Sequence, residues 1–122
     1  MAAFNWVDIK ARCPTCSQET EIRSQLHVAA SFEGDEDRFC NQKYRVGDVL
    51  RWWNKDDPRY HDWKSDEALA KKMDGGVCEC CYATCAANGD KLYVIIQVSA
   101  DLEIERVLEI GPDSEWPLEY LR

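Results

Sequence analysis

A chain of 122 residues with 15 basic and 23 acidic side chains has the length of one domain and a net charge of −8 at pH 7. A duplex-binding module concentrates Lys and Arg to neutralise phosphates, so this balance argues against nucleic acid and favours a basic protein as partner. Hydrophobic residues make up 45% of the chain, which is typical of a globular domain. We therefore expect a single domain over residues 1–122.

The start of the chain has neither the basic region nor the apolar run of a secretory signal, and no apolar stretch is long enough to span a bilayer. These features predict a cytoplasmic protein with no membrane partner. In a reducing compartment, seven cysteines are expected to be metal ligands and buried thiols rather than disulfides.

The first half of the chain predicts short strands. Apolar and polar side chains alternate over residues 4–11 and 20–30, as they do in half-buried strands, and His27 belongs to the outward polar set. Cys40 stands alone and is expected to be a buried, inert thiol. Residues 43–53 predict two short strands joined by a Gly-Asp turn, as a β-hairpin or a bend. The inward side chains of that hairpin are expected to be Tyr44, Val46, Leu50 and one Trp.

An aromatic loop follows this hairpin, and Pro58 excludes it from regular strand pairing. Aromatic side chains beside arginine often anchor protein interfaces, so the loop is our candidate partner-binding surface. The alternative is that its rings pack on the domain's own core. The candidate residues are Trp52, Trp53, Tyr60 and Trp63.

One short helix is predicted to begin at Ser65, whose hydroxyl can cap it. Acidic residues occupy its first turn and lysines its last, which matches the helix dipole at both ends, and the segment 74–76 would end it.

The last third of the chain predicts an antiparallel hairpin. Residues 92–98 form a nearly continuous apolar run typical of a central strand, and residues 102–110 return with apolar side chains facing inward. Trp116 and Leu118 in the tail are expected to lie across the core. The fold class expected from all these segments is a small, β-rich α+β domain of antiparallel strands with one short helix.

Six of the seven cysteines fall in two short clusters. The first is Cys13-Pro-Thr-Cys16, and the second spans residues 78–85 and contains four thiols. Two pairs of closely spaced thiols, one at each of two distant points, are the arrangement that a tetrahedral Zn²⁺ ion requires. The sequence therefore predicts a zinc site.

The chain also matches itself at these clusters. The segment 13–22 parallels the segment 85–94, each with a turn that begins at a cysteine and leads into a strand. This layout resembles the zinc-ribbon (rubredoxin-like) superfamily, whose two turns hold one zinc ion between four thiolates. The resemblance implies a split zinc-ribbon-like site, with residues 31–77 as an insertion between the clusters. Where the second turn would carry its second thiol, this chain has Asn88.

Either the second turn is degenerate and the site holds no metal, or one of the thiols just upstream supplies the missing fourth ligand. Cys81 is the preferred candidate because its spacing from Cys85 lies within the range of zinc pairs. Cys78 with Cys81 is a rival pair, and Cys80 could alternate. The predicted zinc ligands are Cys13, Cys16, Cys81 and Cys85.

The function we expect is that of a non-enzymatic protein-interaction module, of adaptor, inhibitor or immunity type, stabilised by a structural zinc. One alternative is a thiol-disulfide redox protein that uses Cys13 and Cys16, but such a pair needs a helix N-terminus and the following residues predict a strand. A second alternative is a nucleic-acid-associated zinc ribbon, which the resemblance suggests and the net charge opposes. No hydrolytic constellation is recognisable, so we do not expect an enzyme.

Overall fold

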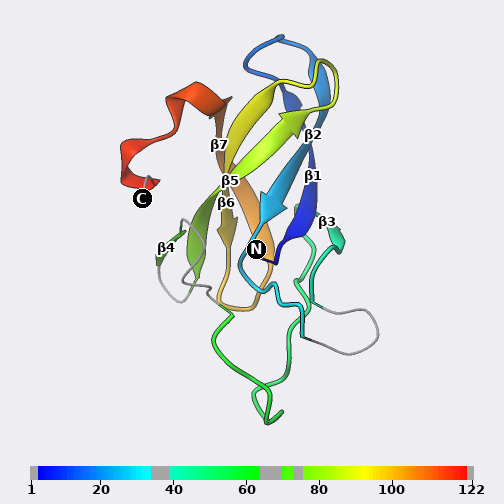
Figure 1. Cartoon of the computed structure of the whole chain (residues 1–122), viewed down its shortest axis with the longest axis vertical. Helices are drawn as coiled ribbons and strands as arrows, with labels where there is room; N and C mark the ends of the chain where they lie inside the picture. The colour runs from blue at the N-terminus through cyan, green and yellow to red at the C-terminus, as the bar shows by residue number, and fades with distance from the viewer. Residues whose placement is uncertain (1–2, 34–38, 64–69, 73–75, 121–122) are drawn as a thin grey trace.

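The computed structural model describes residues 3–33, 39–63, 70–72 and 76–120, and these form one curled sheet (Figure 1). The sheet order is β3-β1-β2-β5-β6-β7, with β4 pairing on β5; all pairs are antiparallel except β1 with β3. The strands are β1 (Asn5–Arg12), β2 (Glu19–Leu26), β3 (Lys43–Arg45), β4 (Ala70–Lys72), β5 (Val77–Cys85), β6 (Lys91–Val98) and β7 (Ile104–Pro112). Two 3₁₀ turns follow, η1 (Asp113–Glu115) and η2 (Leu118–Tyr120).

Alternating side chains account for the β1–β2 hairpin. The two strands pair over their full length, and Ile9 lies opposite Ile22 in the register. Both side chains are buried in the main core, while the intervening polar residues face outward. The two strands expected in the first part of the chain are confirmed, with the second ending at Leu26.

Strand β5 separates two apolar clusters. One face carries Cys81 and Cys85 into the main core, and the other face carries Cys78 and Cys80 into a smaller cluster with Tyr93. Such alternation follows from the two-residue period of a strand. Because both faces are covered, β5 and its neighbour β6 are buried almost throughout, which confirms the central strand expected at residues 92–98.

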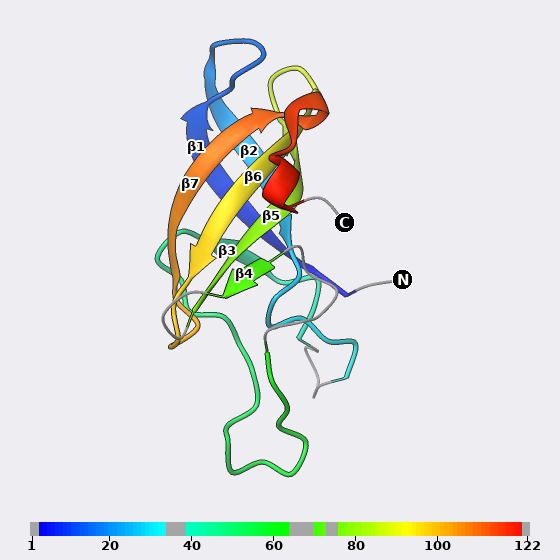
Figure 2. The ribbon, with the colours of Figure 1, turned by 90° about the vertical axis from the view of Figure 1, so that its left-hand side faces the viewer.

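The sheet curls until its two ends approach each other (Figure 2). Two register shifts in the β6–β7 pair increase the local twist, as β-bulges do. The segment after β3 then bonds to the start of β7, from Gly47 N to Ile104 O at 2.7 Å and from Leu50 N to Leu102 O at 2.8 Å. The barrel-like curl is thereby closed at one end only.

The predicted helix is wrong where the structure describes it. Residues 70–72 form strand β4 on the edge of β5, and the rest of the predicted helix, which begins at Ser65, lies outside the described residues. Hydrogen bonding to β5 outweighs the favourable end charges, which contribute only about 0.3–1 kcal/mol each. The described part of the chain contains no α-helix, so the domain is β-rich.

Two smaller expectations are also wrong. Val46 and Leu118 are exposed rather than buried, with exposed fractions of 45% and 85%. The second half of the predicted 43–53 hairpin forms no named strand but a bridge at Val49 to Glu103, because this segment pairs across the molecule with β7 instead of folding back on β3. Tyr44 and Leu50 are buried as expected.

The two hairpin turns that follow β1 and β5 lie together at one end of the molecule, and the loop 51–63 projects from the opposite end (Figures 1 and 2). The thiol turns and the aromatic loop are therefore separate regions. Within the described residues, no helix has the length and apolar character needed to cross a membrane.

Candidate metal centre

The turn between β1 and β2 is built to present two thiols. Cys13 N donates to Gln18 O at 2.9 Å, and Ser17 N donates back to Cys13 O at 2.8 Å. Ser17 has a φ of 61°, in the left-handed region that closes such a tight turn. These bonds bring Cys16 back towards Cys13 within the same turn.

The turn between β5 and β6 repeats this pattern at a separation of 72 residues in the sequence. Cys85 N donates to Asp90 O at 3.0 Å, and Gly89 N donates to Cys85 O at 2.8 Å. Gly89 has a φ of 75° and occupies the place that Ser17 takes in the first turn. The match between segments 13–22 and 85–94 therefore extends to the backbone hydrogen bonds of the turns.

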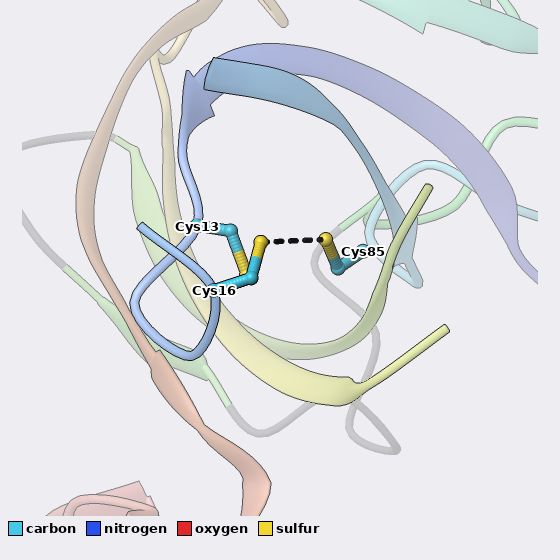
Figure 3. A group of neighbouring side chains, drawn as sticks. All are labelled: Cys13, Cys16 and Cys85. Carbon is cyan, nitrogen blue, oxygen red and sulfur yellow. Dashed lines mark hydrogen bonds between the residues drawn. The ribbon is translucent and has the colours of Figure 1, made fainter. Parts of the chain in front are cut away.

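Pairing between β2 and β5 brings the two turns together. Ile22 lies opposite Cys85 in the register, and Ala86 N donates to Glu21 O at 3.0 Å. As a result the Sγ atoms of Cys13, Cys16 and Cys85 all lie within 4.8 Å of one another (Figure 3). Three of the four predicted ligands are thus brought to one point.

The spacing of these sulfurs fits a tetrahedral metal ion. With metal–sulfur bonds of about 2.3 Å, two thiolates on one Zn²⁺ ion lie about 3.8 Å apart. The Sγ atoms of Cys16 and Cys85 are 3.9 Å apart. Soft thiolate donors in this number select Zn²⁺, Cu⁺ or iron, so the chemistry of the three side chains also fits a metal centre.

The first turn favours the thiolate form of Cys13. Burial opposes its ionisation, but hydrogen bonds from the Thr15 hydroxyl and from the backbone N–H groups of Thr15 and Cys16 outweigh burial and lower the pKa of Cys13 to about 6. For Cys16, the Gln18 N–H favours the thiolate, but burial and the adjacent Cys13 and Cys85 sulfurs together raise the pKa of the Cys16 thiol. Three thiolates at such short distances would repel one another, and a cation between them would offset that repulsion.

Cys81 does not join this cluster, so the prediction that it is the fourth ligand is wrong. It lies four residues before Cys85 on the same face of β5, which places it about 13 Å away along the strand at about 3.3 Å per residue. Its Sγ instead contacts Glu79 Oε2 at 3.0 Å. Burial and the Glu79 carboxylate raise the pKa of the Cys81 thiol well above its usual value.

The other two candidate ligands, Cys78 and Cys80, also lie outside the thiol cluster. Cys78 and Cys80 point into the smaller apolar cluster, and burial with the nearby carboxylates of Glu79 and Glu109 raises the pKa of Cys80 to about 12. Cys40 is buried near the bridge that joins Ser31 to Phe39, as expected for an inert thiol. All seven cysteines are thiols rather than disulfides.

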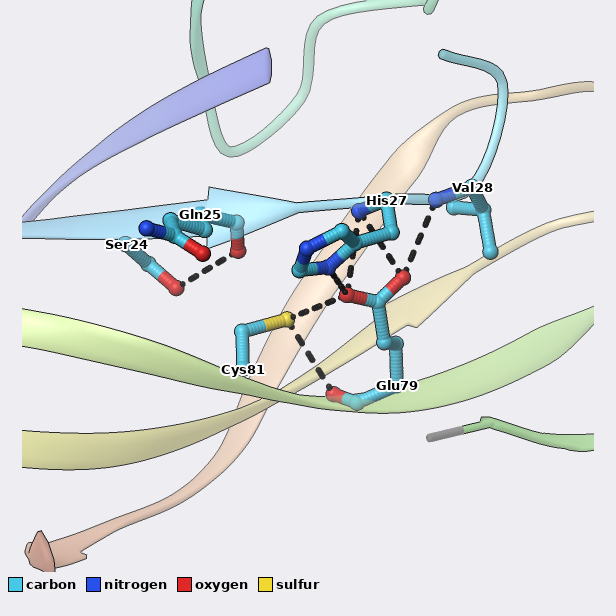
Figure 4. Close-up of polar contacts among 6 residues, drawn as sticks. All are labelled: Ser24, Gln25, His27, Val28, Glu79 and Cys81. Atoms are coloured by element: carbon cyan, nitrogen blue, oxygen red, sulfur yellow. Dashed lines mark hydrogen bonds and ion pairs between the residues drawn. The ribbon is translucent and has the colours of Figure 1, made fainter. Parts of the chain in front are cut away.

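A buried carboxylate network beside β2 was not predicted (Figure 4). Glu79 is completely buried and accepts hydrogen bonds from the backbone N–H groups of His27 and Val28, each at 3.0 Å, and contacts His27 Nδ1 at 2.8 Å. His27 was expected to face solvent, but β2 ends one residue earlier and the chain turns towards β5. The available signal was a single acidic residue within the apolar, cysteine-rich run 77–81.

The proposed partner-binding aromatics are only partly on the surface. Trp53 and Trp63 are buried, with exposed fractions of 6% and 7%, so these two are corrected from surface candidates to core residues. Trp63 joins the main core, and Trp53 packs edge-on against Phe39. Trp52 and Tyr60 are half-buried and retain exposed surface on the projecting loop.

Comparison with known proteins identifies no relative of this chain: no family model, curated protein or solved structure matches it. The geometry of the thiol cluster and its surroundings therefore carries the functional argument alone.

Proposed function

We propose that this chain is a non-enzymatic protein-interaction module in which a zinc ion bound by Cys13, Cys16 and Cys85 fastens two hairpins together. The observation that supports this proposal is the convergence of three thiols from two turns with matching hydrogen bonds. The zinc-ribbon resemblance of the turns points to the same ion.

A metal ion at this point would join parts of the chain that are 69 residues apart in sequence between Cys16 and Cys85. Structural zinc contributes an apparent binding free energy of about 10–16 kcal/mol in zinc-finger peptides at neutral pH. A domain has a net stability of only about 5–15 kcal/mol, so this contribution can determine whether the end of the sheet that carries the turns is ordered.

The interaction role is supported by charge and by the projecting loop. The net charge of −8 favours association with a basic protein surface. Trp52 and Tyr60 keep exposed surface on the loop, and the Arg59 guanidinium lies 5.7 Å above the Trp53 ring beside them. Aromatic and arginine side chains in this combination are enriched in binding hot spots.

The redox alternative has one favourable observation, the lowered pKa of Cys13. Thiol-disulfide exchange also requires access to the attacking sulfur, and Cys13 is completely buried. The residues after Cys16 lead into strand β2 rather than a helix. The lowered pKa therefore comes from the Thr15 hydroxyl and the N–H groups of the turn, which equally suit a metal ligand.

The metal content of the full chain, purified without chelators, tests the zinc centre. We expect stoichiometric zinc in the wild type, loss of zinc in Cys13→Ser, and wild-type zinc in Cys40→Ser, which removes a buried thiol outside the cluster. Absence of metal from the wild type, with a melting curve that chelator leaves unchanged, would contradict the proposal.

The interaction role needs a separate experiment. Affinity capture from the native cells, compared between the wild type and a Trp52→Ala/Tyr60→Ala variant of equal thermal stability, should recover a basic protein only with the wild type. Recovery of the same partner by the variant would remove the loop from the proposed interface.

A further inference from the structure

The fourth position of the metal centre is where the two turns differ. Cys16 occupies the fourth residue of the first turn, and Asn88 occupies the fourth residue of the second. Asn88 Oδ1 accepts a hydrogen bond from Asp90 N at 2.9 Å. Its Nδ2 donates to Asp90 Oδ2 at 3.1 Å and to Thr15 Oγ1 at 3.3 Å.

These bonds engage both ends of the Asn88 amide within the turns. Its oxygen forms an Asx-type bond that stabilises the second turn, and its nitrogen links that turn to Thr15 of the first. The amide therefore replaces a cysteine as a turn-forming residue without offering its oxygen as a metal ligand. Among the described residues, no fourth Cys, His, Asp or Glu joins the three thiols.

The approach to this position is open to solvent on the side of the turns. Thr15 and all residues from 86 to 90 are exposed, and Cys16 is half-buried, whereas Cys13 and Cys85 are completely buried. A ligand from solution could reach the ion past Cys16 and Asn88 without opening the core.

We infer that the zinc ion is held by three thiolates of this chain and takes its fourth ligand from solution, as a neutral donor: water, or an imidazole nitrogen that displaces it. This inference rests on the proposed zinc centre. Three thiolates and one divalent cation already carry a net charge of −1, and Asp90 lies in the adjacent turn. A fourth anionic ligand would add charge next to an acidic residue in a chain of net charge −8, so a neutral donor is favoured.

Cobalt substitution of the full-length protein tests this inference, because the visible bands of Co²⁺ report its ligands directly. We expect Co²⁺ in the wild type to show bands of three thiolates and one lighter donor, and these bands should shift in a saturable way as imidazole is added. Retention of Co²⁺ during the titration is checked by filtration.

Asn88→Cys is the matching gain-of-function variant. It should supply the fourth thiolate, intensify the sulfur-to-metal charge-transfer band, abolish the response to imidazole and raise the Co²⁺ affinity by about tenfold or more. Ala87→Cys adds a thiol at the neighbouring exposed residue and should behave as the wild type.

Three outcomes would overturn the inference or its premise. A wild-type spectrum that already matches Asn88→Cys and ignores imidazole would show that the chain supplies all four ligands. Ligand-field bands of Co²⁺ that shift in Asn88→Ala before imidazole is added, with an imidazole response in that variant but none in the wild type, would show that Asn88 itself is a ligand. Failure of the wild type to bind Co²⁺ would overturn the zinc centre, whereas binding without an imidazole response overturns only the open fourth position.

Discussion

Strand β5 carries cysteines in two different environments, although they lie only a few residues apart in the sequence. Cys85 lies at the end of the strand, where it meets the thiols of the opposite turn. Cys80 and Cys81 lie in the middle of the strand, each within an apolar cluster and close to the carboxylate of Glu79. The first environment brings three sulfurs to one point and favours the thiolate of Cys13, whereas the second favours neutral thiols at Cys80 and Cys81.

This difference shows that the backbone around a thiol decides its chemistry. The Thr15 hydroxyl and the N–H groups of the turn lower the pKa of Cys13 to about 6, whereas burial beside carboxylates raises the pKa of Cys80 to about 12. Suitable spacing alone therefore does not make a cysteine pair a candidate metal pair; a turn must also bring its sulfurs together, as it does for Cys13 and Cys16. The four predictions below test the contrast, from the largest expected effect to the smallest.

Replacing one cysteine by serine in each environment should give the largest difference in zinc content and stability. Cys85→Ser should lose tight zinc binding and with it an apparent free energy on the order of 10 kcal/mol, enough to unfold the end of the sheet that carries the turns. Cys81→Ser should keep its zinc and lose only about 1–3 kcal/mol, because one buried hydrogen bond to Glu79 is altered.

Metal analysis and chelator-dependent melting measure both effects. Equal zinc loss in the two variants would mean that Cys81 is a ligand after all. Zinc retained at wild-type affinity in Cys85→Ser would instead remove Cys85 from the centre.

The second test concerns the carboxylate that defines the other environment. Glu79→Gln places an amide where five hydrogen-bonding contacts converge, from His27, Val28 and Cys81. The amide N–H₂ would face backbone donors, so we expect a loss of about 3–5 kcal/mol in the free energy of unfolding, as when a buried charge network is broken. Glu105→Gln, an exposed carboxylate on β7, is the control and should change the urea midpoint little.

The sequence predicts strands with a clear apolar pattern better than it predicts the cysteine-rich strand or the contacts between distant segments. Strands with clear alternation, β1 and β2, and the apolar strand β6 were found because burial of one or both faces is visible in their composition. Strand β5 is not predicted because its nine residues include four cysteines and Glu79, which suggest ligands rather than core. For the same reason Cys81 was assigned to the metal and Glu79 was not assigned at all.

The site itself was predictable in part. Cys13, Cys16 and Cys85 follow from the repeated turn, whose spacing is local and so can be recognised in the sequence. The ligand set beyond them depends on which strands pair, here β2 with β5, and this long-range register has no local signature. The prediction that Trp53 and Trp63 lie on the surface is wrong for the same reason. Both are buried, and they contact residues distant in the sequence, Phe39 and Ala29 among them.

The third prediction concerns alkaline pH. The pKa of Cys80 is about 12 in the folded protein and about 8.5 for an ordinary thiol in an unfolded chain. Below the unfolded value both states keep the proton, and above it only the unfolded state gains from ionisation, so stability falls as the pH rises from about 9 towards 12.

Cys80→Ala removes this contribution. The metal-saturated variant should therefore lose less stability than the wild type between about pH 8.5 and pH 10.5, as urea denaturation at each pH would show. Cys81 and Tyr93, whose pKa values are also raised, should leave a residual decline. An unchanged pH dependence in Cys80→Ala would indicate that its thiol is not in the protonated, buried state.

The smallest expected change in stability comes from a comparison of the two turns that carry Cys13, Cys16 and Cys85. Ser17 has a φ of 61° and Gly89 a φ of 75° at the same place in each turn, and left-handed backbone costs a residue other than glycine about 1–2 kcal/mol. Ser17→Gly should therefore stabilise the protein by about 0.5 kcal/mol after the entropy cost of glycine is subtracted. Gly89→Ala should destabilise it by about 1 kcal/mol.

No atom lies within 4 Å of the position that a Cβ at Gly89 would take, so this loss would come from the backbone conformation and not from a steric clash. Urea denaturation with zinc in excess measures both changes, and unchanged zinc content shows that the centre is intact. If the two turns share one geometry, the changes in unfolding free energy should have opposite signs in the two variants. A neutral Gly89→Ala together with a stabilising Ser17→Gly would mean that only the first turn is held in the left-handed conformation, and that the second turn can adopt another conformation at little cost.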